Sequence, residues 1–129
     1  MTAKTIVHTD KAPAAIGPYS QAVVAEGGKT LYLSGQLGLD PATGALVSDN
    51  VEEQVRQAFS NLTEVINAAG GSLENIVKLT LFVTDLGNFG IVNSVMSELI
   101  PEPFPARSTV EVSGLPKGGL FEVEAIVVI

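Results

Sequence analysis

The chain has 129 residues, of which 46% are hydrophobic and 16% are charged. This composition indicates one globular domain, residues 1–129, and is too hydrophobic for a disordered chain. Fourteen acidic and seven basic residues give a formal net charge of −7. The basic residues are scattered singly, so we expect no nucleic-acid-binding face. The chain has no cysteine and one histidine, His8, which excludes disulfides, a thiolate nucleophile and a histidine-cluster zinc site.

The sequence contains no recognisable targeting or cofactor motif. Residues 1–7 lack the apolar core of a signal peptide, and no apolar run approaches the length of about 18 residues expected of a transmembrane helix. A P-loop, a dinucleotide fingerprint and a metal-ligand cluster are also missing from the sequence. We therefore expect a cytoplasmic protein with neither a membrane partner nor a bound metal.

Short strands are predicted at the start of the chain. Residues 5–7, 20–25 and 30–34 each show a strand pattern. Gly27 and Gly28 lie between the last two segments and suit a tight turn, so we expect those two strands to pair as a hairpin.

Two helices are predicted in the middle of the chain. The first spans residues 51–69, with Asp49 or Asn50 as its N-cap and two glycines as its stop. Its apolar positions recur at helical spacing: Val51, Val55, Phe59, Leu62, Val65, Ile66 and Ala69. The second helix spans about residues 88–99 and ends before Pro101. Its apolar stripe is Phe89, Val92, Met96 and Leu99.

Three longer strands complete the predicted fold. Apolar and polar residues alternate over residues 77–84, 106–113 and 121–128. The order is two or three strands, a long helix, a strand, a short helix and two strands. This order predicts an α+β fold in which the helices cover one face of a sheet.

The other face of the predicted sheet mixes apolar and charged side chains. If Val77, Val110 and Val123 lie under the helices, the opposite face carries Phe82, Ile126, Val128, Arg107, Thr109 and Glu122. Such a face fits neither a core nor a solvent surface. Burial against another subunit accounts for it, so we expect an oligomer with polar strand residues at the subunit boundary.

The two arginines are candidates for different roles. Arg56 lies among acidic residues on the polar side of the first helix and is predicted to be a surface charge. Arg107 enters a strand of small and β-branched residues, where its planar fork of donors matches a carboxylate. The residues leave two interpretations of Arg107 open: a structural salt bridge with Glu111 or Glu122, or an anchor for an anionic substrate.

Three further groups of residues each allow a functional and a purely structural interpretation. Glu122 and Glu124 share a strand face and form either an acid/base pair or a solvated edge. Tyr19 follows a stiff Gly-Pro turn, and either packing or a ligand accounts for it. Ser34 and Gly35 end a predicted strand, where the glycine permits either close approach to a ligand or an ordinary turn.

Several runs of sequence resemble the reactive intermediate deaminase family, known as RidA or YjgF. They follow one another over nearly the whole chain: APAAIGPYSQA at 12–22, SGQ at 34–36, VKLTLFVTDL at 77–86, FPARSTVEV at 104–112 followed by LP at 115–116, and EVEA at 122–125. The run that contains Arg107 is the most specific of them.

The resemblance implies a fold, an assembly and an activity. The fold is a chorismate-mutase-like sheet of about six strands with two helices on one face, assembled as a homotrimer with sites between subunits. The activity is hydrolysis of 2-aminoacrylate, 2-iminopropanoate and 2-iminobutanoate to 2-oxo acids and ammonia. No metal or organic cofactor is implied.

The resemblance also implies roles for particular residues. Arg107 matches the arginine that holds the substrate carboxylate, and Glu122 matches the acid that serves the hydrolytic step with a bound water. Tyr19 matches a tyrosine that lines the cleft, and the other pocket-lining positions are Ser34, Gly35 and Asn93. Thr109 stands where the typical deaminase has cysteine, and its hydroxyl can bond a water or a substrate nitrogen.

Two other functions compete with the deaminase. One is a trimer that binds small carboxylates for regulation without turnover. The other is the ribonuclease or translation-inhibitor role of some family members, which the dispersed cations and the net charge of −7 disfavour.

Overall fold

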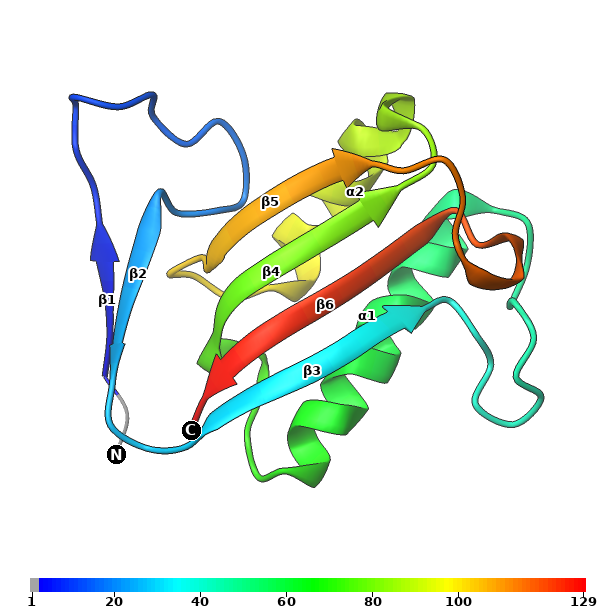
Figure 1. The fold of residues 1–129 in the computed structure, drawn as a ribbon, viewed down its shortest axis with the longest axis horizontal. Coiled ribbons are helices and arrows are strands. Elements are labelled where there is room, and N and C mark those ends of the chain that lie inside the picture. The colour runs from blue at the N-terminus through cyan, green and yellow to red at the C-terminus, as the bar shows by residue number, and fades with distance from the viewer. Residues whose placement is uncertain (1–2) are drawn as a thin grey trace.

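The computed structural model describes residues 3–129, which contain six strands and two α-helices (Figure 1). In chain order they are β1 (Ala3–Val7), β2 (Ala22–Glu26), β3 (Thr30–Leu37), α1 (Val51–Ala68), β4 (Ile76–Val83), α2 (Phe89–Leu99), β5 (Ala106–Glu111) and β6 (Phe121–Val128). Four strands form one sheet in the order β3-β6-β4-β5, in which only β4 and β5 are parallel. Strands β1 and β2 form a separate antiparallel ribbon.

The α+β fold with six strands and two helices is confirmed, but the strands are divided between two sheets. An isolated parallel bridge joins Ser20, just before β2, to Ala106 at the β5 edge. The predicted hairpin between β2 and β3 is wrong, because β2 pairs with β1 and β3 pairs with β6. Gly27 and Gly28 do form a turn with positive φ angles of 75° and 66°, but that turn leads the chain from the ribbon into the sheet.

Helix α1 begins and ends close to its predicted bounds. The Asn50 side chain accepts a hydrogen bond from the Glu53 backbone N–H at 3.0 Å, as expected of an N-cap. Past its end, Gly70 has a φ of 91° that other residues rarely adopt.

The buried side of α1 differs from the predicted stripe. Ala69 is exposed just past the end of the helix, and Ala58, outside the predicted stripe, is fully buried. Val65 is 43% exposed, whereas Gln54 is buried. Gln54 is tolerated there because its amide donates to the Ser48 carbonyl oxygen and accepts from the Leu120 N–H, each at 2.9 Å. A hydrophobic pattern alone cannot identify such a residue.

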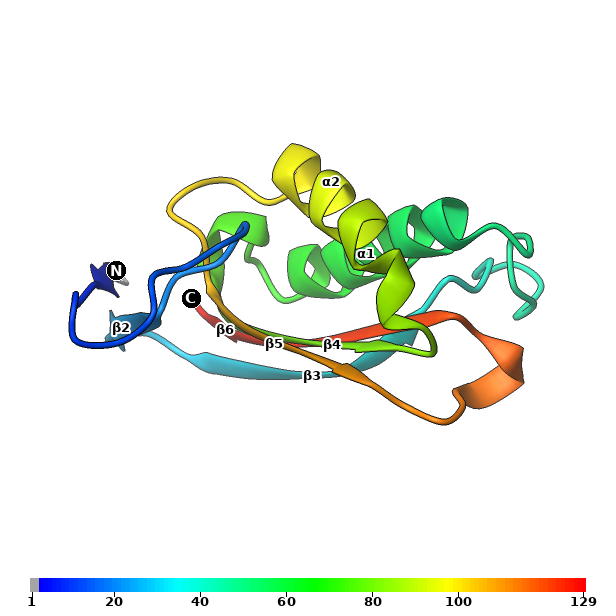
Figure 2. The same ribbon diagram turned by 90° about the horizontal axis from the view of Figure 1, so that it is seen from above.

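Both helices lie on one side of the four-stranded sheet, and no other part of residues 3–129 covers its second side (Figure 2). The core between these layers contains Phe59, Leu62, Leu79, Leu81 and Phe121, all at most 1% exposed. Burying each such side chain contributes about 1.5–3 kcal/mol relative to exposure. Within the described residues, no helix combines the length and apolarity needed to cross a bilayer.

The side of the sheet on which β5 places its polar residues corrects the sequence prediction. Leu79 pairs with Arg107, and Leu81 pairs with Thr109. Because paired residues of neighbouring strands point to the same face, Arg107 and Thr109 lie on the helix-covered face rather than the open one. Val110 is instead 42% exposed on the open face.

Glu122 lies on the open face, as the sequence predicts. It is paired with Phe82, while its neighbours Phe121 and Val123 are both buried on the helix side. The sheet therefore separates Glu122 from Arg107 within one chain.

Candidate functional site

Arg107 extends from the start of β5 beneath helix α2. Its Nη1 donates a hydrogen bond to Asn93 Oδ1 at 2.6 Å and lies 3.4 Å from Met96 Sδ. Burial lowers the pKa of the Arg107 guanidinium from its ordinary value, and the neighbouring Tyr19 opposes this shift. An arginine keeps its charge at neutral pH despite such a shift, so the helix-covered face contains a fixed positive charge.

Two aromatic rings contact this charge. The Arg107 guanidinium carbon lies 4.8 Å from the ring centre of Tyr19 and 5.2 Å from that of Phe89. Both distances fall within the range of cation–π attraction. The rings therefore limit how the guanidinium can turn while leaving its outward N–H groups available.

Arg107 has no carboxylate partner among residues 3–129. The ion pairs of this part of the chain are His8–Asp10, Arg56–Glu52 and Arg56–Glu98. The proposed salt bridge of Arg107 is not formed, because Glu111 accepts from the Leu86 N–H and Glu122 lies across the sheet. A half-buried guanidinium without a counter-charge favours an anionic ligand.

Arg56 differs from Arg107 in its surroundings. It forms a two-pronged pair with Glu98 at 2.9 and 3.1 Å and a further bond to Glu52 at 3.1 Å. These contacts raise the pKa of Arg56 above its ordinary value. Its charge is exposed and already compensated, so it does not form a second anion site.

The charged end of Arg107 opens into a pocket of about 190 Å³ lined by Ile16, Tyr19, Phe89, Arg107 and Thr109. The Thr109 hydroxyl is buried and has no hydrogen-bond partner among residues 3–129. A buried polar atom without a partner is unfavourable unless a ligand or water completes it. The pocket therefore contains a positive charge that can bind an acidic ligand and a hydroxyl that is free to bond it.

Ser34, Gly35 and Glu122 form a second group on the open face. The β3–β6 register shifts between Leu33 and Gln36, which places Ser34 and Gly35 in a bulge. A Cβ atom on Gly35 would lie 2.8 Å from the Glu122 side-chain carboxyl carbon, so glycine permits this close approach. Ser34 is exposed beside it.

The predicted site residues are thus brought together in two groups. Tyr19, Arg107 and Thr109 line the pocket, and Asn93 is bonded to Arg107. Ser34, Gly35 and Glu122 lie on the opposite face. The sequence prediction missed Phe89 as a pocket wall. Its position in an apolar helical stripe indicated a core residue, and no local signal distinguished it from one.

Residues 9–129 match the protein family described as Endoribonuclease L-PSP, which is the YjgF/RidA family. The chain belongs to this family. The 2-iminobutanoate/2-iminopropanoate deaminase of Bos taurus is 49% identical to it over 125 residues, which cover 97% of this chain and 90% of that protein.

Solved RidA-family structures share its fold. RidA from an Antarctic Psychrobacter has a TM-score of 0.77 and 47% identity, covering 97% of this chain and 99% of that chain. Escherichia coli TdcF, solved with bound serine, has a TM-score of 0.72 and 38% identity, covering 97% and 98%. The RidA resemblance of the sequence motifs is confirmed, while the roles assigned to single residues stay predictions.

Proposed function

We propose that this protein hydrolyses 2-imino acids and their enamine tautomers, such as 2-iminobutanoate, 2-iminopropanoate and 2-aminoacrylate. One water adds to the imine carbon, the carbon–nitrogen bond breaks, and the products are a 2-oxo acid and ammonia. The half-buried Arg107 charge, which has no carboxylate partner in the described part of the chain, carries this proposal because it suits a small acid. Curated relatives at 43–49% identity have names that give the same activity.

The pocket suits the binding and orientation of the substrate. Arg107 holds the substrate carboxylate through its planar fork, and Asn93 fixes the guanidinium from the other side. The imine carbon then lies between the walls formed by Tyr19 and Phe89. The Thr109 hydroxyl bonds the substrate nitrogen or the attacking water, which satisfies its missing hydrogen bond.

Activation of the attacking water requires a residue from a second chain. Glu122 serves as the base that orients the water, and in one chain the sheet separates it from Arg107. The open face around it is apolar in part, with Tyr32 78% exposed and Val110 42% exposed. Placing the open face of one subunit against the pocket of the next covers this surface and completes the site.

The contact proposed here joins two different surfaces of the chain. An interface of this head-to-tail kind forms a ring when the rotation between successive subunits closes, and an open filament when it does not. The homotrimer implied by the sequence resemblance is such a ring. Light scattering after size-exclusion chromatography tests it, and a monomer in solution would contradict it.

Mixing two inactive variants tests whether a site combines two chains. When Arg107→Lys and Glu122→Gln subunits are refolded together in equal amounts, about a quarter of the sites between subunits should contain both native residues. We expect the mixture to have roughly this fraction of the parent's imine hydrolysis, and each variant alone to have very little. A mixture no more active than its components would show that both residues act within one chain or not at all.

A coupled assay tests the reaction itself. A threonine dehydratase generates 2-iminobutanoate, and the yield of semicarbazone adduct measures how much imine escapes hydrolysis. We expect the protein to lower that yield in proportion to its concentration. Because TdcF was solved with bound serine, binding without turnover is the second candidate. It becomes the conclusion if 2-oxobutanoate binds but the adduct yield does not change.

Thr109→Val should separate activity from stability. Valine removes the unpaired hydroxyl at nearly constant shape, so the free energy of unfolding should rise by about 1 kcal/mol. The loss of a hydrogen bond to the substrate or water should lower kcat/KM by roughly 3- to 100-fold. Thermal melting and imine hydrolysis measure the two effects. Full activity in the valine variant would show that this side chain only packs.

The cytoplasmic location and the lack of nucleic-acid binding stay predictions from the sequence. Cleavage of RNA by preparations freed of contaminating nuclease, and lost on substitution of a residue of this chain, would contradict the second of them.

A further inference from the structure

The loop between β1 and β2, residues 8–21, contributes two pocket walls, Ile16 and Tyr19. Residues 8–16 are exposed and belong to no helix or strand. Outside the strands, the loop makes two backbone–backbone hydrogen bonds within the described chain. The Tyr19 N–H donates to the Gly17 oxygen at 2.8 Å, and the Ser20 N–H donates to the Pro105 oxygen at 2.9 Å. Backbone pairing therefore does not hold the first half of this loop, and side chains have to do so.

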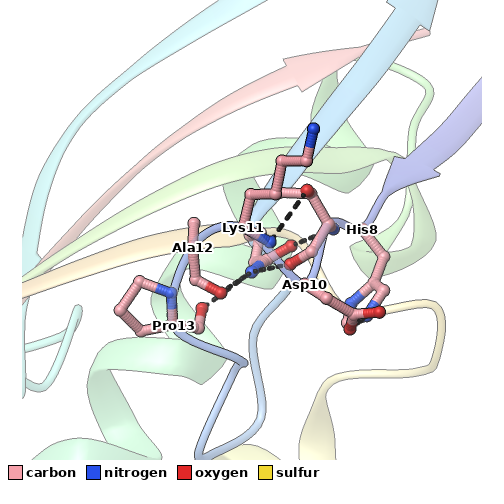
Figure 3. Close-up of polar contacts among 7 residues, drawn as sticks. His8, Asp10, Lys11, Ala12 and Pro13 are labelled. Atoms are coloured by element: carbon pink, nitrogen blue, oxygen red, sulfur yellow. Dashed lines mark hydrogen bonds and ion pairs between the residues drawn. The ribbon is translucent and has the colours of Figure 1, made fainter.

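Gln21 supplies this support through its carboxamide. Its Oε1 accepts from the Thr9 N–H at 2.7 Å, and its Nε2 donates to the Pro13 oxygen at 2.7 Å and the Thr9 oxygen at 3.1 Å. A longer contact of 3.4 Å reaches the Ala12 oxygen, next to Pro13 (Figure 3). One side chain thus connects both limbs of the loop.

Gln21 is also close to the pocket along the chain. Tyr19, two residues earlier, contacts Arg107 through its ring and accepts the Ile16 N–H at 3.3 Å. Ser20, between them, donates its backbone N–H to the residue before Ala106. Three successive residues therefore attach the aromatic ring, the sheet edge and the loop to one another.

We propose that Gln21 is a positioning residue for the Arg107 pocket, because its carboxamide holds the loop that places Ile16 at the pocket and the Tyr19 ring against the guanidinium. This inference rests on the proposed function, in which the pocket binds small carboxylates. A purely structural role for Gln21 predicts lower stability with unchanged ligand affinity. A positioning role predicts weaker ligand binding with a nearly unchanged chemical step, since Gln21 contacts no reacting atom.

Gln21→Glu tests the inference with little change of shape. Glutamate keeps an oxygen that accepts from the Thr9 N–H. Its second oxygen replaces the Nε2 donor and therefore faces the Thr9 and Pro13 carbonyl oxygens without a hydrogen to donate. We expect the Kd of 2-oxobutanoate, measured by calorimetry, and the KM for the imine each to rise about tenfold. We expect kcat to stay within about threefold of the parent. Gln21→Ala allows the same measurements if the glutamate variant does not fold.

Limited trypsin digestion provides a readout that needs no activity. Lys11 lies in the loop, and mass spectrometry resolves cleavage after it from cleavage at other sites. We expect faster cleavage there in Gln21→Glu than in the parent, and weaker protection by saturating 2-oxobutanoate. Gln57→Glu is the matched control, because it removes one amide bond of 2.9 Å to Asn61 on α1, away from the loop. It should behave as the parent does.

The possible failures are distinguishable. If the parent binds and hydrolyses while Gln21→Glu matches it in Kd, KM and protection, the inference about Gln21 is overturned and the proposed function stands. If the parent neither binds 2-oxobutanoate nor hydrolyses the imine, the proposed function fails and takes the inference with it.

Discussion

Arg107→Lys is expected to lower kcat/KM for 2-iminobutanoate by about 100-fold. A lysine keeps the positive charge but loses the planar fork that binds a carboxylate with two parallel bonds. It also cannot donate to Asn93 and to both carboxylate oxygens with the geometry that Arg107 has. A hydrogen bond to a charged partner contributes about 1.5–3 kcal/mol, which corresponds to a factor of roughly 10 to 150. The coupled dehydratase assay measures this loss.

The same variant should keep its fold. Arg107 makes no salt bridge within residues 3–129. The melting temperature of the Arg107→Lys protein should therefore stay within a few degrees of the parent's. Arg56→Lys is the matched control, because it makes the same change in a charge that is exposed and paired with Glu98. It should retain activity within about twofold. Arg107→Lys activity equally close to the parent's would assign Arg107 a structural role.

Glu122→Gln is expected to lower kcat by about 10²- to 10⁴-fold, the usual contribution of a positioned general base. The neutral amide has the same size, so the close contact with Gly35 is kept. Because Glu122 does not contact Arg107 within a chain, the Kd of 2-oxobutanoate should stay within about threefold. Stopped-flow decay of the imine and calorimetry measure the two quantities.

Glu124→Gln provides the control for this change. Glu124 lies on the same strand and the same face as Glu122 but is exposed. Its amide variant should retain the parent's kcat. Equal losses of affinity and rate in Glu122→Gln would assign Glu122 to ligand binding instead of water activation.

Local features of the sequence predicted much of this protein. Asp49 or Asn50 at the start and the two glycines at the end marked the bounds of α1, and apolar alternation located β4 and β6. These signals act within a few residues, through backbone caps and the two-residue repeat of a strand, so they need no knowledge of the rest of the chain. The motif around Arg107 pointed to the family and to a carboxylate-binding role for this residue.

Only the tertiary structure decided which residues face one another. Alternation in β5 is the same whether Arg107 or Val110 points to the helices, and the parallel register with β4 selects Arg107. The same register aligns Thr109 with the core residue Leu81, where its hydroxyl finds no hydrogen-bond partner in the part of the chain that the structure describes. Strand pairing is a long-range contact, so a one-residue shift reverses every side chain without changing the local pattern. For that reason the sequence determined the candidate residues and the fold class, and the folded sheet decided that Arg107 and Glu122 lie on opposite faces.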